Sequence, residues 1–403
     1  FINFCALSTA KGMNVIMKGG VRKRGKTWNY YFYVGEINGK KKMKEKSGFK
    51  SKPIAEKAMR DALYEYEHGN YIEPKKIILT QFALEWLDGY VKPLRKITTY
   101  NNKELINKYL SPSIGHINIV DIQPIHIEKM LLDIKKENSI GNSTLQSIYT
   151  ITNTIMNRAL KLKLIRDNPC KYIERPKRSN YRAEILDADE IPKLYNALDL
   201  NNMYDYMFNI ALRLTLELGL RRGELGGLEW KDINFKDNLI TVRNNLIYTE
   251  GHVYMIDPKT DESNRAVYIS NEALHLLKEL HKKQAKNKLK YGQFYTDKNI
   301  FKDNDNKYDL VMVWQDGKYI HPMYYLNKLK KVLKKANINK NVTFHNLRHT
   351  NATLLLQEGN DLKVIQERLG HKDISTTANI YSHINKKMQK QATDSISNLI
   401  NGN

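Results

Sequence analysis

The spacing of apolar residues changes twice along this 403-residue chain, and these changes limit how it can fold. Residues 28–34 are rich in aromatic side chains and end in a β-branched valine, as strands do, and Asn38-Gly39 then predicts a type I′ hairpin. From Leu79 to about Pro176, apolar residues recur instead at steps of three and four, which indicates helices. From about Ile185, helical segments alternate with short β segments. The chain is therefore predicted to be a multidomain α+β protein.

The predicted domains follow these changes in pattern. The first is a small three-stranded sheet backed by one helix, which Ser51 and Pro53 begin. A helical domain follows, then a polar and basic linker, then a mixed, mainly α domain with a small β-sheet. The β segments of this last domain include residues 239–248, 252–256 and 265–270. The bounds of the four parts are 17–75, 76–176, 177–184 and 185–403.

Residues 1–16 are expected to lie outside this domain plan. They have a short apolar start, but they lack the basic n-region of a secretory signal and fit neither a helix nor a strand. We interpret them as translated upstream sequence, with the natural start at Met13 or Met17.

The formal net charge of +23 and the pI near 9.6 indicate a polyanionic partner. Nucleic acid and an anionic membrane both qualify. The basic residues are spread over the whole chain and no lipidation motif is present, so nucleic acid is favoured. No apolar run approaches the roughly eighteen residues that span a bilayer. The two cysteines, Cys5 and Cys170, cannot form a disulfide framework or a four-cysteine zinc site, so a cytoplasmic location is expected.

The predicted N-terminal sheet is strongly basic. Between Lys18 and Lys52 twelve lysines and arginines are opposed only by Glu36 and Glu45. Basic strands with interleaved aromatic residues suit a DNA groove. The alternative is a solvated hairpin, because lysine-rich edges also deter aggregation. The candidate DNA-binding residues are Arg22, Lys23, Arg24, Trp28, Tyr31, Lys40 and Lys42.

Two stretches early in the last domain carry cations that could bind a phosphate. In the sequence GLRRGEL, an apolar helix is predicted to end at Gly219, and Arg221 would emerge at that junction. The alternative is that Arg221 only caps carbonyl groups or pairs with Glu224. Further on, Lys259 follows a predicted strand, and the next strand begins near Arg265. Lys259 is therefore expected at a hairpin tip, unless it is simply a solvated lysine.

Two later stretches add histidines, an arginine and a tyrosine. His345 and Arg348 are three residues apart and share one face of a predicted helix. His345 and His349 have the spacing of zinc ligands, but Asn346 stands where a zinc protease has glutamate, and no third ligand is evident. His371 follows a predicted helix at residues 362–369, and Tyr381 is expected on the next short helix. Taken singly, these could be a capping histidine and a half-buried tyrosine.

Together, the six residues suit one reaction, the cleavage of a phosphodiester. Negative charge builds on the non-bridging oxygens, so preorganised cations lower the barrier, and the planar fork of arginine binds two oxygens at once. A tyrosine hydroxyl is a competent nucleophile when its proton can be removed. A lysine or histidine can donate a proton to the departing 5′ oxygen. None of these steps requires a metal ion or another cofactor.

In this order, the motifs resemble those of the tyrosine recombinases, specifically the integrases of the phage and conjugative-transposon type. The matching stretches are GLRRGEL with Arg221, PKT…SNR with Lys259, HNLRHT with His345 and Arg348, and LGH…Y with His371 and Tyr381. The resemblance covers nearly all of the chain from Met17. The N-terminal sheet and helix resemble the arm-binding domain of that family, and the helical part resembles its core-binding domain.

The resemblance implies a role for each matching residue. Tyr381 would attack the scissile phosphate, giving a 3′-phosphotyrosine and a free 5′ hydroxyl. The other implied roles are phosphate binding by Arg221 and Arg348, protonation of the leaving oxygen by Lys259, handling of the tyrosine proton by His345, a phosphate hydrogen bond from His371, and support of the arginines by Glu224.

The resemblance also implies partners and an overall reaction. Four protomers would assemble on two DNA duplexes, at core and arm sites, and exchange strands through a Holliday junction to integrate and excise a mobile element. No cofactor is implied. An excisionase and a host DNA-bending protein would take part, and residues 386–400 would form a tail helix that docks onto a neighbouring protomer.

Three other functions are weighed against this one. A type IB topoisomerase uses similar chemistry without exchanging partners, and junction formation would distinguish it. A DNA-binding protein on a decayed recombinase fold would not need all six residues. A chromosome-dimer resolvase usually lacks the additional N-terminal domain that this sequence predicts.

Overall fold

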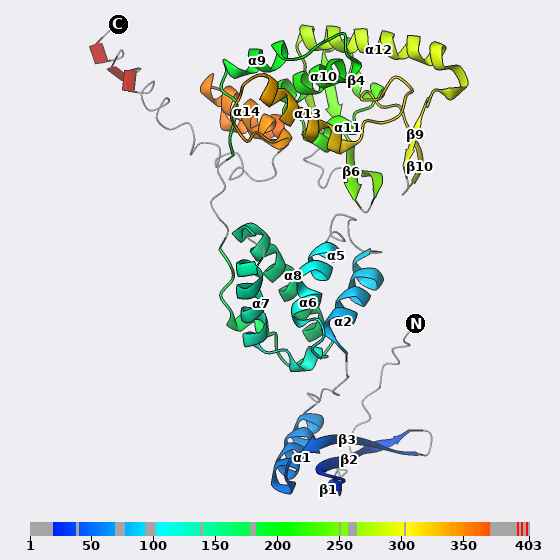
Figure 1. The fold of residues 1–403 in the computed structure, drawn as a ribbon, viewed down its shortest axis with the longest axis vertical. Coiled ribbons are helices and arrows are strands. Elements are labelled where there is room, and N and C mark those ends of the chain that lie inside the picture. Colours follow the sequence, from blue (N-terminus) through cyan, green and yellow to red (C-terminus); the bar gives the residue numbers. More distant parts are fainter. Residues whose placement is uncertain are drawn as a thin grey trace. The chain divides into compact units, whose positions relative to one another are not determined.

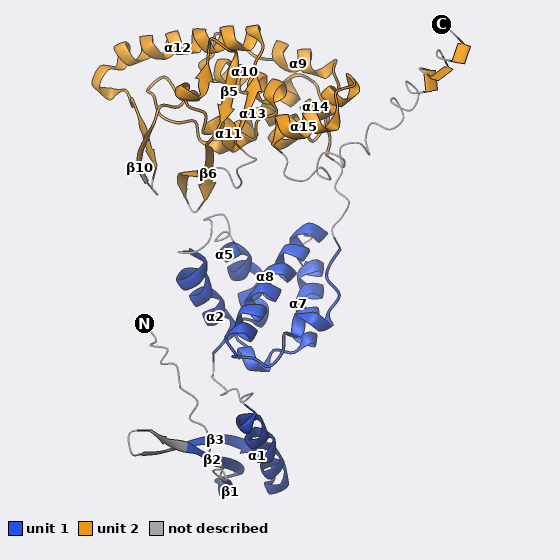
Figure 2. Ribbon diagram, turned by 180° about the vertical axis from the view of Figure 1, so that it is seen from behind, with its two compact units in different colours: residues 1–179 blue, residues 180–403 orange. Residues whose placement is uncertain are grey.

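A computed structural model describes most of the chain, in two compact units of residues 1–179 and 180–403 (Figure 2). None of the described helices is long and apolar enough to cross a membrane. The residues that the structure describes are 19–37, 40–68, 77–92, 102–137, 140–177, 183–249, 251–256, 264–301, 304–370, 393–394, 396–397 and 400–401.

The N-terminal part of the first unit is a three-stranded antiparallel sheet covered by one helix (Figure 1). Tyr30 and Phe32 are buried with Ala62 of the helix, whereas Tyr31 and Tyr33 alternate with them on the other face, as a strand requires. The pairing of Ile37 with Lys40 leaves two residues to connect the strands, so the predicted hairpin is confirmed; the turn itself lies outside the described residues. The elements are β1 (Gly19–Arg24), β2 (Thr27–Ile37), β3 (Lys40–Phe49) and α1 (Lys52–Glu67).

The rest of the first unit is helical, as the periodicity predicts. Its buried core contains apolar side chains from most of its helices, among them Leu79, Ile127 and Ile148. The helices are α2 (Leu79–Trp86), extended by a wide π turn (Leu87–Val91), α5 (Asn102–Leu105), which a second π turn (Ile106–Leu110) joins to α6 (Ser111–Ile114), α7 (Pro124–Glu137) and α8 (Asn142–Lys161). Short 3-10 turns lie at Ile119–Asp121 and Pro169–Tyr172.

A buried asparagine fixes the end of this helical domain. Asn168 donates to the side-chain oxygens of Asn153 and Asn157 on α8, at 2.7 and 2.8 Å, and accepts from the backbone N–H of Cys170 at 2.9 Å. Its amide is completely buried, and these bonds satisfy its polar atoms. The chain beyond α8 is thereby held against the helix. This segment includes Arg175, which lines a groove along α8.

The second unit is built around α10, whose side chains are buried along almost its whole length. Helices α12 and α14 pack against α10, and α15 packs against α14. The helices are α9 (Glu190–Asn196), α10 (Met203–Leu218), α11 (Arg222–Gly226), α12 (Asn271–Tyr291), α13 (Pro322–Lys335), α14 (Phe344–Gln357) and α15 (Leu362–Leu369), with 3-10 turns at Trp230–Asp232 and Gly292–Phe294.

The strands of this unit form three small antiparallel sheets, in the orders β4-β5-β8, β6-β7 and β10-β9. The strands are β4 (Ile233–Asn234), β5 (Leu239–Val242), β6 (Asn245–Thr249), β7 (His252–Ile256), β8 (Arg265–Tyr268), β9 (Asn299–Phe301) and β10 (Asn304–Tyr308).

Two sequence-based expectations about these strands are wrong. Residues 239–248 do not form one β segment, because β5 and β6 belong to different sheets and Arg243-Asn244 separate them. β7 and β8 are not partners in a hairpin either: β7 pairs with β6, and β8 pairs with β5. The predicted hairpin of β7 and β8 is therefore wrong, and Lys259 itself lies outside the described residues. The pairing is decided by partners distant in sequence, which a local pattern does not report.

Candidate active site and DNA-binding surfaces

Arg221 emerges where α10 ends, as predicted. Gly219 terminates the helix in the left-handed region, with φ +64°, and a Cβ there would lie 2.3 Å from the Leu369 side chain. Only glycine fits both the backbone conformation and this close approach. Two residues later Arg221 precedes α11, where its backbone N–H donates to Glu224 Oε2 at 2.9 Å and its Nη1 donates to Glu224 Oε1 at 2.5 Å. The Arg221 side chain remains 35% exposed.

Arg348 lies beneath this turn and is almost completely buried, with 1% exposure. Its Nη1 donates to the carbonyl of Gly219 at 2.6 Å, and its Nη2 donates to the carbonyl of Leu369. Nη1 is also 3.8 Å from Glu224 Oε2. Its Nε is buried and has no hydrogen-bond partner within the described part of the chain. The structure therefore brings Arg221 and Arg348 together around Glu224.

Glu224 is the buried anion that these cations share, and its side chain is 6% exposed. Burial alone would raise the pKa of its carboxyl group. Hydrogen bonds from Arg265 and the charges of Arg265, Arg221 and Arg348 outweigh burial and lower the pKa to about 2. Glu224 is consequently ionised at neutral pH and holds the guanidinium groups close together despite their mutual repulsion.

A cavity of about 360 Å³ lies beside this cluster and is lined by Arg221, Arg222, Thr343 and His345, among others. His345 is one turn before Arg348 on α14, and it is partly accessible to solvent. Partial desolvation lowers the pKa of His345, and the charges of Arg348 and Arg221 lower it further. A neutral imidazole at this position can accept a proton from a group that enters the cavity.

Three of the six predicted catalytic residues lie outside the described residues: Lys259, His371 and Tyr381. His371 directly follows Gly370, which ends α15 with φ +63° and accepts a hydrogen bond from Arg221 Nη2 at 3.2 Å. The α15 helix and its glycine stop have the bounds that the sequence predicts. Among the described residues there is no group of three or more His, Cys, Asp or Glu side chains that could hold a metal ion.

Arg265 belongs to the same cluster and was missed by the sequence reasoning. It is buried at the start of β8, and its Nη1 and Nη2 donate to the two oxygens of Glu224 at 3.2 and 2.9 Å. The signal was present in the strand pattern. Arg265 and Val267 occupy the buried face of β8, and an arginine on a buried strand face needs an acidic partner.

The N-terminal sheet carries the other predicted DNA-binding residues. Arg22 donates to Glu45 at 2.8 Å and lies over the Tyr31 ring, with 5.1 Å from its guanidinium carbon to the ring centroid. Both lie on the sheet face opposite the buried Tyr30 and Phe32. Lys23, Arg24 and Lys42 are exposed, Trp28 is half-buried, and the Lys40 side chain lies outside the described residues.

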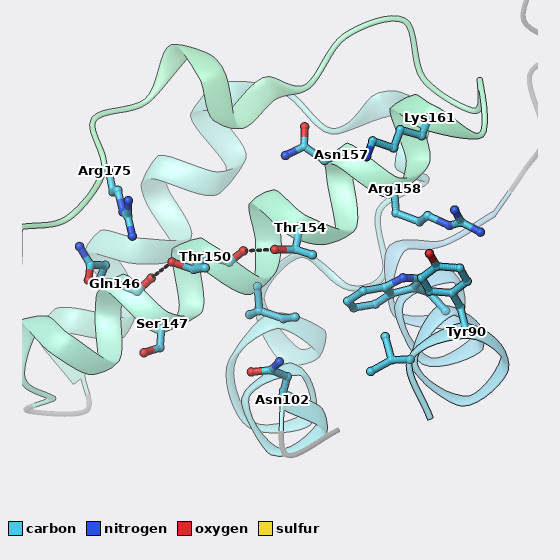
Figure 3. Close-up of a pocket in the computed structure, with 13 residues that line it drawn as sticks. Tyr90, Asn102, Gln146, Ser147, Thr150, Thr154, Asn157, Arg158, Lys161 and Arg175 are labelled. Atoms are coloured by element: carbon cyan, nitrogen blue, oxygen red, sulfur yellow. Dashed lines mark hydrogen bonds between the residues drawn. The ribbon is translucent and has the colours of Figure 1, made fainter. Parts of the chain in front are cut away.

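The helical domain holds a groove of about 590 Å³ that sequence reasoning did not predict (Figure 3). Uncharged hydrogen-bonding side chains line it along α8, including Gln146, Thr150 and Thr154, and Arg158 lies over the Tyr90 ring with 4.2 Å to the centroid. Lys161 and Arg175 add two further cations, and none of the described residues that line the groove is acidic. The four-residue spacing of 146, 150, 154 and 158 on the polar side of an amphipathic helix was the available signal.

Comparison with known protein families decides the identity. The model described as "Phage integrase family" matches residues 184–388, "Arm DNA-binding domain" matches 21–66, and "Phage integrase, N-terminal SAM-like domain" matches 78–133. The chain belongs to the phage integrase family. The predicted family, fold class and enzyme class are confirmed, and the chain is a tyrosine recombinase, a DNA breaking-rejoining enzyme.

Curated relatives match over most of their length. A XerC-like tyrosine recombinase of Caldanaerobacter subterraneus subsp. tengcongensis is 29% identical over 383 residues, which cover 90% of this chain and 93% of that protein. The ICEBs1 integrase of Bacillus subtilis is 27% identical over 306 residues, 74% of this chain and 77% of that protein. XerD of Staphylococcus epidermidis is 30% identical over 324 residues, 79% of this chain and 93% of that protein.

Solved structures share the fold. An integrase of the Tn1549 transposon, in complex with a circular intermediate DNA, superposes with a TM-score of 0.64 at 19% identity, over 79% of this chain and 99% of that chain. A lambda integrase tetramer bound to a Holliday junction superposes with a TM-score of 0.55 at 19% identity, over 87% of this chain and 92% of that chain.

Proposed function

We propose that this integrase inserts and excises a mobile element by cleaving DNA through a 3′-phosphotyrosine, without a metal ion, and by exchanging strands through a Holliday junction. The observation that carries the proposal is the cluster of Arg221 and Arg348 around Glu224, beside a cavity that His345 also lines. Arg221 and His345 line the cavity, and Arg348 lies near the same carboxylate as Arg221. Two cations and a neutral base in this arrangement suit nucleophilic attack on a phosphodiester.

Arg221 and Arg348 would bind the scissile phosphate. Arg221 is partly exposed at the cavity wall, so its guanidinium can reach a non-bridging oxygen and keep its contact with Glu224. For Arg348 we assign Nε as the donor, because this N–H is buried and unpaired within the described part of the chain. Charge-assisted hydrogen bonds in a desolvated site stabilise the negative charge that builds in the transition state.

The chemical step would use four further residues. The Tyr381 hydroxyl oxygen forms a bond to phosphorus, and its proton passes to His345. The bond from phosphorus to the 5′ oxygen breaks, and Lys259 gives that oxygen a proton. His371 would hydrogen-bond the phosphate. The products are a 3′-phosphotyrosine and a free 5′ hydroxyl, so the bond energy is kept and the step is reversible without ATP.

The remaining surfaces would hold the DNA. We assign arm sites to the basic sheet of residues 17–75 and core sites to the helical domain of residues 76–176, with 177–184 as the linker to the catalytic residues 185–403. As far as the chain is described, the groove along α8 combines uncharged hydrogen-bonding groups with three cations and no carboxylate, which suits a nucleic-acid surface. Arg158 and Lys161 would contact phosphates there.

The assembly would be a homotetramer on two duplexes, in which residues 386–400 of one protomer dock onto the next. An excisionase and a host DNA-bending protein would set the direction of the reaction. Two of the similar proteins are integrases named for the mobile elements ICEBs1 and Tn1549, which supports a mobile-element role. The enzyme would act in a bacterial cytoplasm, on the nucleoid.

The test is a cleavage assay on DNA that the protein itself selects from a random duplex library. A nicked duplex of the selected site, incubated with the full chain in excess EDTA, should give a covalent protein–DNA adduct on a denaturing gel. A paired assay with two intact sites should give a four-way junction. Loss of the adduct in EDTA with recovery in Mg²⁺ or Zn²⁺ would refute the metal-free mechanism, and plasmid relaxation without a junction would indicate a topoisomerase.

A further inference from the structure

Three consecutive carbonyl groups at the end of α15 each accept a hydrogen bond from a different arginine. Arg265 Nε donates to the carbonyl of Arg368 at 2.7 Å, Arg348 Nη2 donates to that of Leu369, and Arg221 Nη2 donates to that of Gly370 at 3.2 Å. Carbonyls in the last turn of a helix lack partners within the helix and carry partial negative charge. They therefore attract guanidinium groups.

The same three arginines contact Glu224 on α11. The carboxylate and the end of α15 thus bind three cations between them, which come from the start of α11, from β8 and from α14. The chain leaves this cluster at Gly370, and the segment with His371 and Tyr381 begins immediately afterwards. The geometry of the arginines and the anchor of that segment are consequently set by one network of contacts.

Arg265 differs from Arg221, which is 35% exposed and lines the cavity, and from Arg348, whose Nε has no hydrogen-bond partner among the described residues. The Arg265 side chain is 6% exposed and does not line the cavity. Each of its three nitrogens donates to the protein, two of them to the two oxygens of Glu224 and the third to the Arg368 carbonyl. Such a paired contact fixes the plane of the carboxylate as well as its position. Because its side chain is buried and does not line the cavity, we expect no contact between Arg265 and DNA.

Arg221 and Arg348 depend on that fixed carboxylate. Arg221 reaches one oxygen with Nη1, and Arg348 Nη1 lies 3.8 Å from the other. Without Arg265, Glu224 would be free to rotate toward either arginine, and α15 would lose the contact at Arg368. Small displacements of groups that bind a reacting phosphate are costly, at about 100-fold in rate for about 1 Å.

We propose that Arg265 is a positioning residue for DNA cleavage: it orients Glu224 between Arg221 and Arg348 and anchors the last turn of α15, and it does so without touching DNA. This inference rests on the proposed function. It adds Arg265 to the six catalytic residues and Glu224 as a residue on which the rate of cleavage depends.

The experiment measures single-turnover cleavage of the selected site by the full chain with Arg265→Ala and Arg265→Lys. At saturating DNA, the cleavage rate constant of Arg265→Ala should fall by about 100-fold. DNA affinity should stay near that of the unaltered protein, because Arg265 makes no phosphate contact. Arg265→Lys keeps the charge but cannot pair with both carboxylate oxygens. Its rate constant should therefore lie between that of the unaltered protein and that of Arg265→Ala.

Two readouts separate positioning from a structural role. A structural role would lower the amplitude of adduct formation, because fewer molecules are folded, and leave the rate constant unchanged. The second readout is the pH profile. Glu224 faces Arg221, Arg265, Arg348 and His345. Arg265 lowers the pKa of Glu224, so its loss should raise that pKa. The rate of Arg265→Ala should then decline more steeply from pH 7 to pH 5 than the rate of the unaltered protein, in which His345 alone causes a decline.

The matched control is Lys328→Ala, which removes the ion pair with Asp205 between α13 and α10, away from the cavity. It should lower thermal stability and leave the cleavage rate constant unchanged. If the unaltered protein forms no adduct, the proposed function fails. If it forms the adduct and Arg265→Ala cleaves at the same rate constant, the positioning role is refuted. Should Arg265→Ala not fold, an unchanged rate constant for Arg265→Lys refutes it equally.

Discussion

Replacing Glu224 with glutamine should strongly destabilise the catalytic unit. The substitution keeps the side-chain shape but removes the negative charge that Arg221, Arg265 and Arg348 share. It also turns one acceptor oxygen into an NH₂ group that faces guanidinium N–H donors. Three neighbouring cations, two of them buried, would then lack their common counter-ion.

The size of the effect can be worked from the pKa of Glu224. The ordinary value of 4.5 falls to about 2 in the folded protein, and at about 1.4 kcal/mol per pKa unit the difference corresponds to about 3 kcal/mol. Because the carboxylate is 6% exposed, solvent screening reduces this little. Breaking a buried ion pair by removing one partner typically costs about 3–5 kcal/mol, which agrees.

The dependence on pH has a definite sign. The folded-state pKa of Glu224 is depressed, so its charge contributes fully above about pH 4.5 and the contribution is lost as the pH falls through about 2. The stability difference between the unaltered protein and Glu224→Gln should therefore shrink from about 3 kcal/mol at pH 7 to about 1 kcal/mol at pH 3.

The assay is amide hydrogen exchange during a urea titration, followed by mass spectrometry of peptides from α10, which report the opening of the catalytic unit separately from the other domains. The matched control is Glu279→Gln, because Glu279 is exposed and pairs only at the surface with Lys282; no measurable change is expected. Equal stability of Glu224→Gln and the unaltered protein at pH 7, or a difference that does not change with pH, would refute the reasoning.

Three further predictions concern the DNA reaction. Lys259→Ala should slow cleavage, and a 5′-phosphorothiolate substrate, whose leaving group needs no proton, should restore much of the rate; without that rescue Lys259 is not the general acid. A chain that begins at Ile78 should bind arm-bearing DNA with a log–log salt slope smaller by about three, if three or four phosphate contacts are lost; an unchanged slope would exclude arm binding. Arg158→Ala should reduce the log–log salt slope of binding to core-site DNA by about one. An unchanged slope would mean that Arg158 on α8 does not contact the DNA.

Local chemistry in the sequence predicts much of the fold. Glycines at 219 and 370 end helices in the left-handed region at the predicted residues, because no other residue adopts that conformation as readily. The two-residue connection at 38–39 predicts the β2–β3 pairing for a similar reason. These features depend on residues within one or two turns of each other, which is the range that a sequence pattern reports.

Contacts between distant residues account for what sequence reasoning missed. The pairing of β8 with β5, within the β4-β5-β8 sheet, cannot be read from either strand alone. The same holds for Arg265, whose partner Glu224 lies 41 residues earlier. The burial of Arg348 depends on carbonyls from two other helices, at Gly219 and Leu369. The motifs predict that Arg221, His345 and Arg348 belong to one site. The structure adds that Glu224 holds the two arginines together and that Arg221 and His345 line one cavity.

The central claim is that Tyr381 carries the DNA after cleavage, and mass spectrometry of the adduct tests it most directly. The full chain is trapped on a nicked duplex of the selected site in EDTA, digested with protease and nuclease, and searched for the peptide that retains a nucleotide. The account predicts one such peptide, with the nucleotide on Tyr381 through its 3′ phosphate, and no adduct from a Tyr381→Phe protein that still binds the DNA. A nucleotide on another residue, or an adduct that persists in Tyr381→Phe, would contradict it.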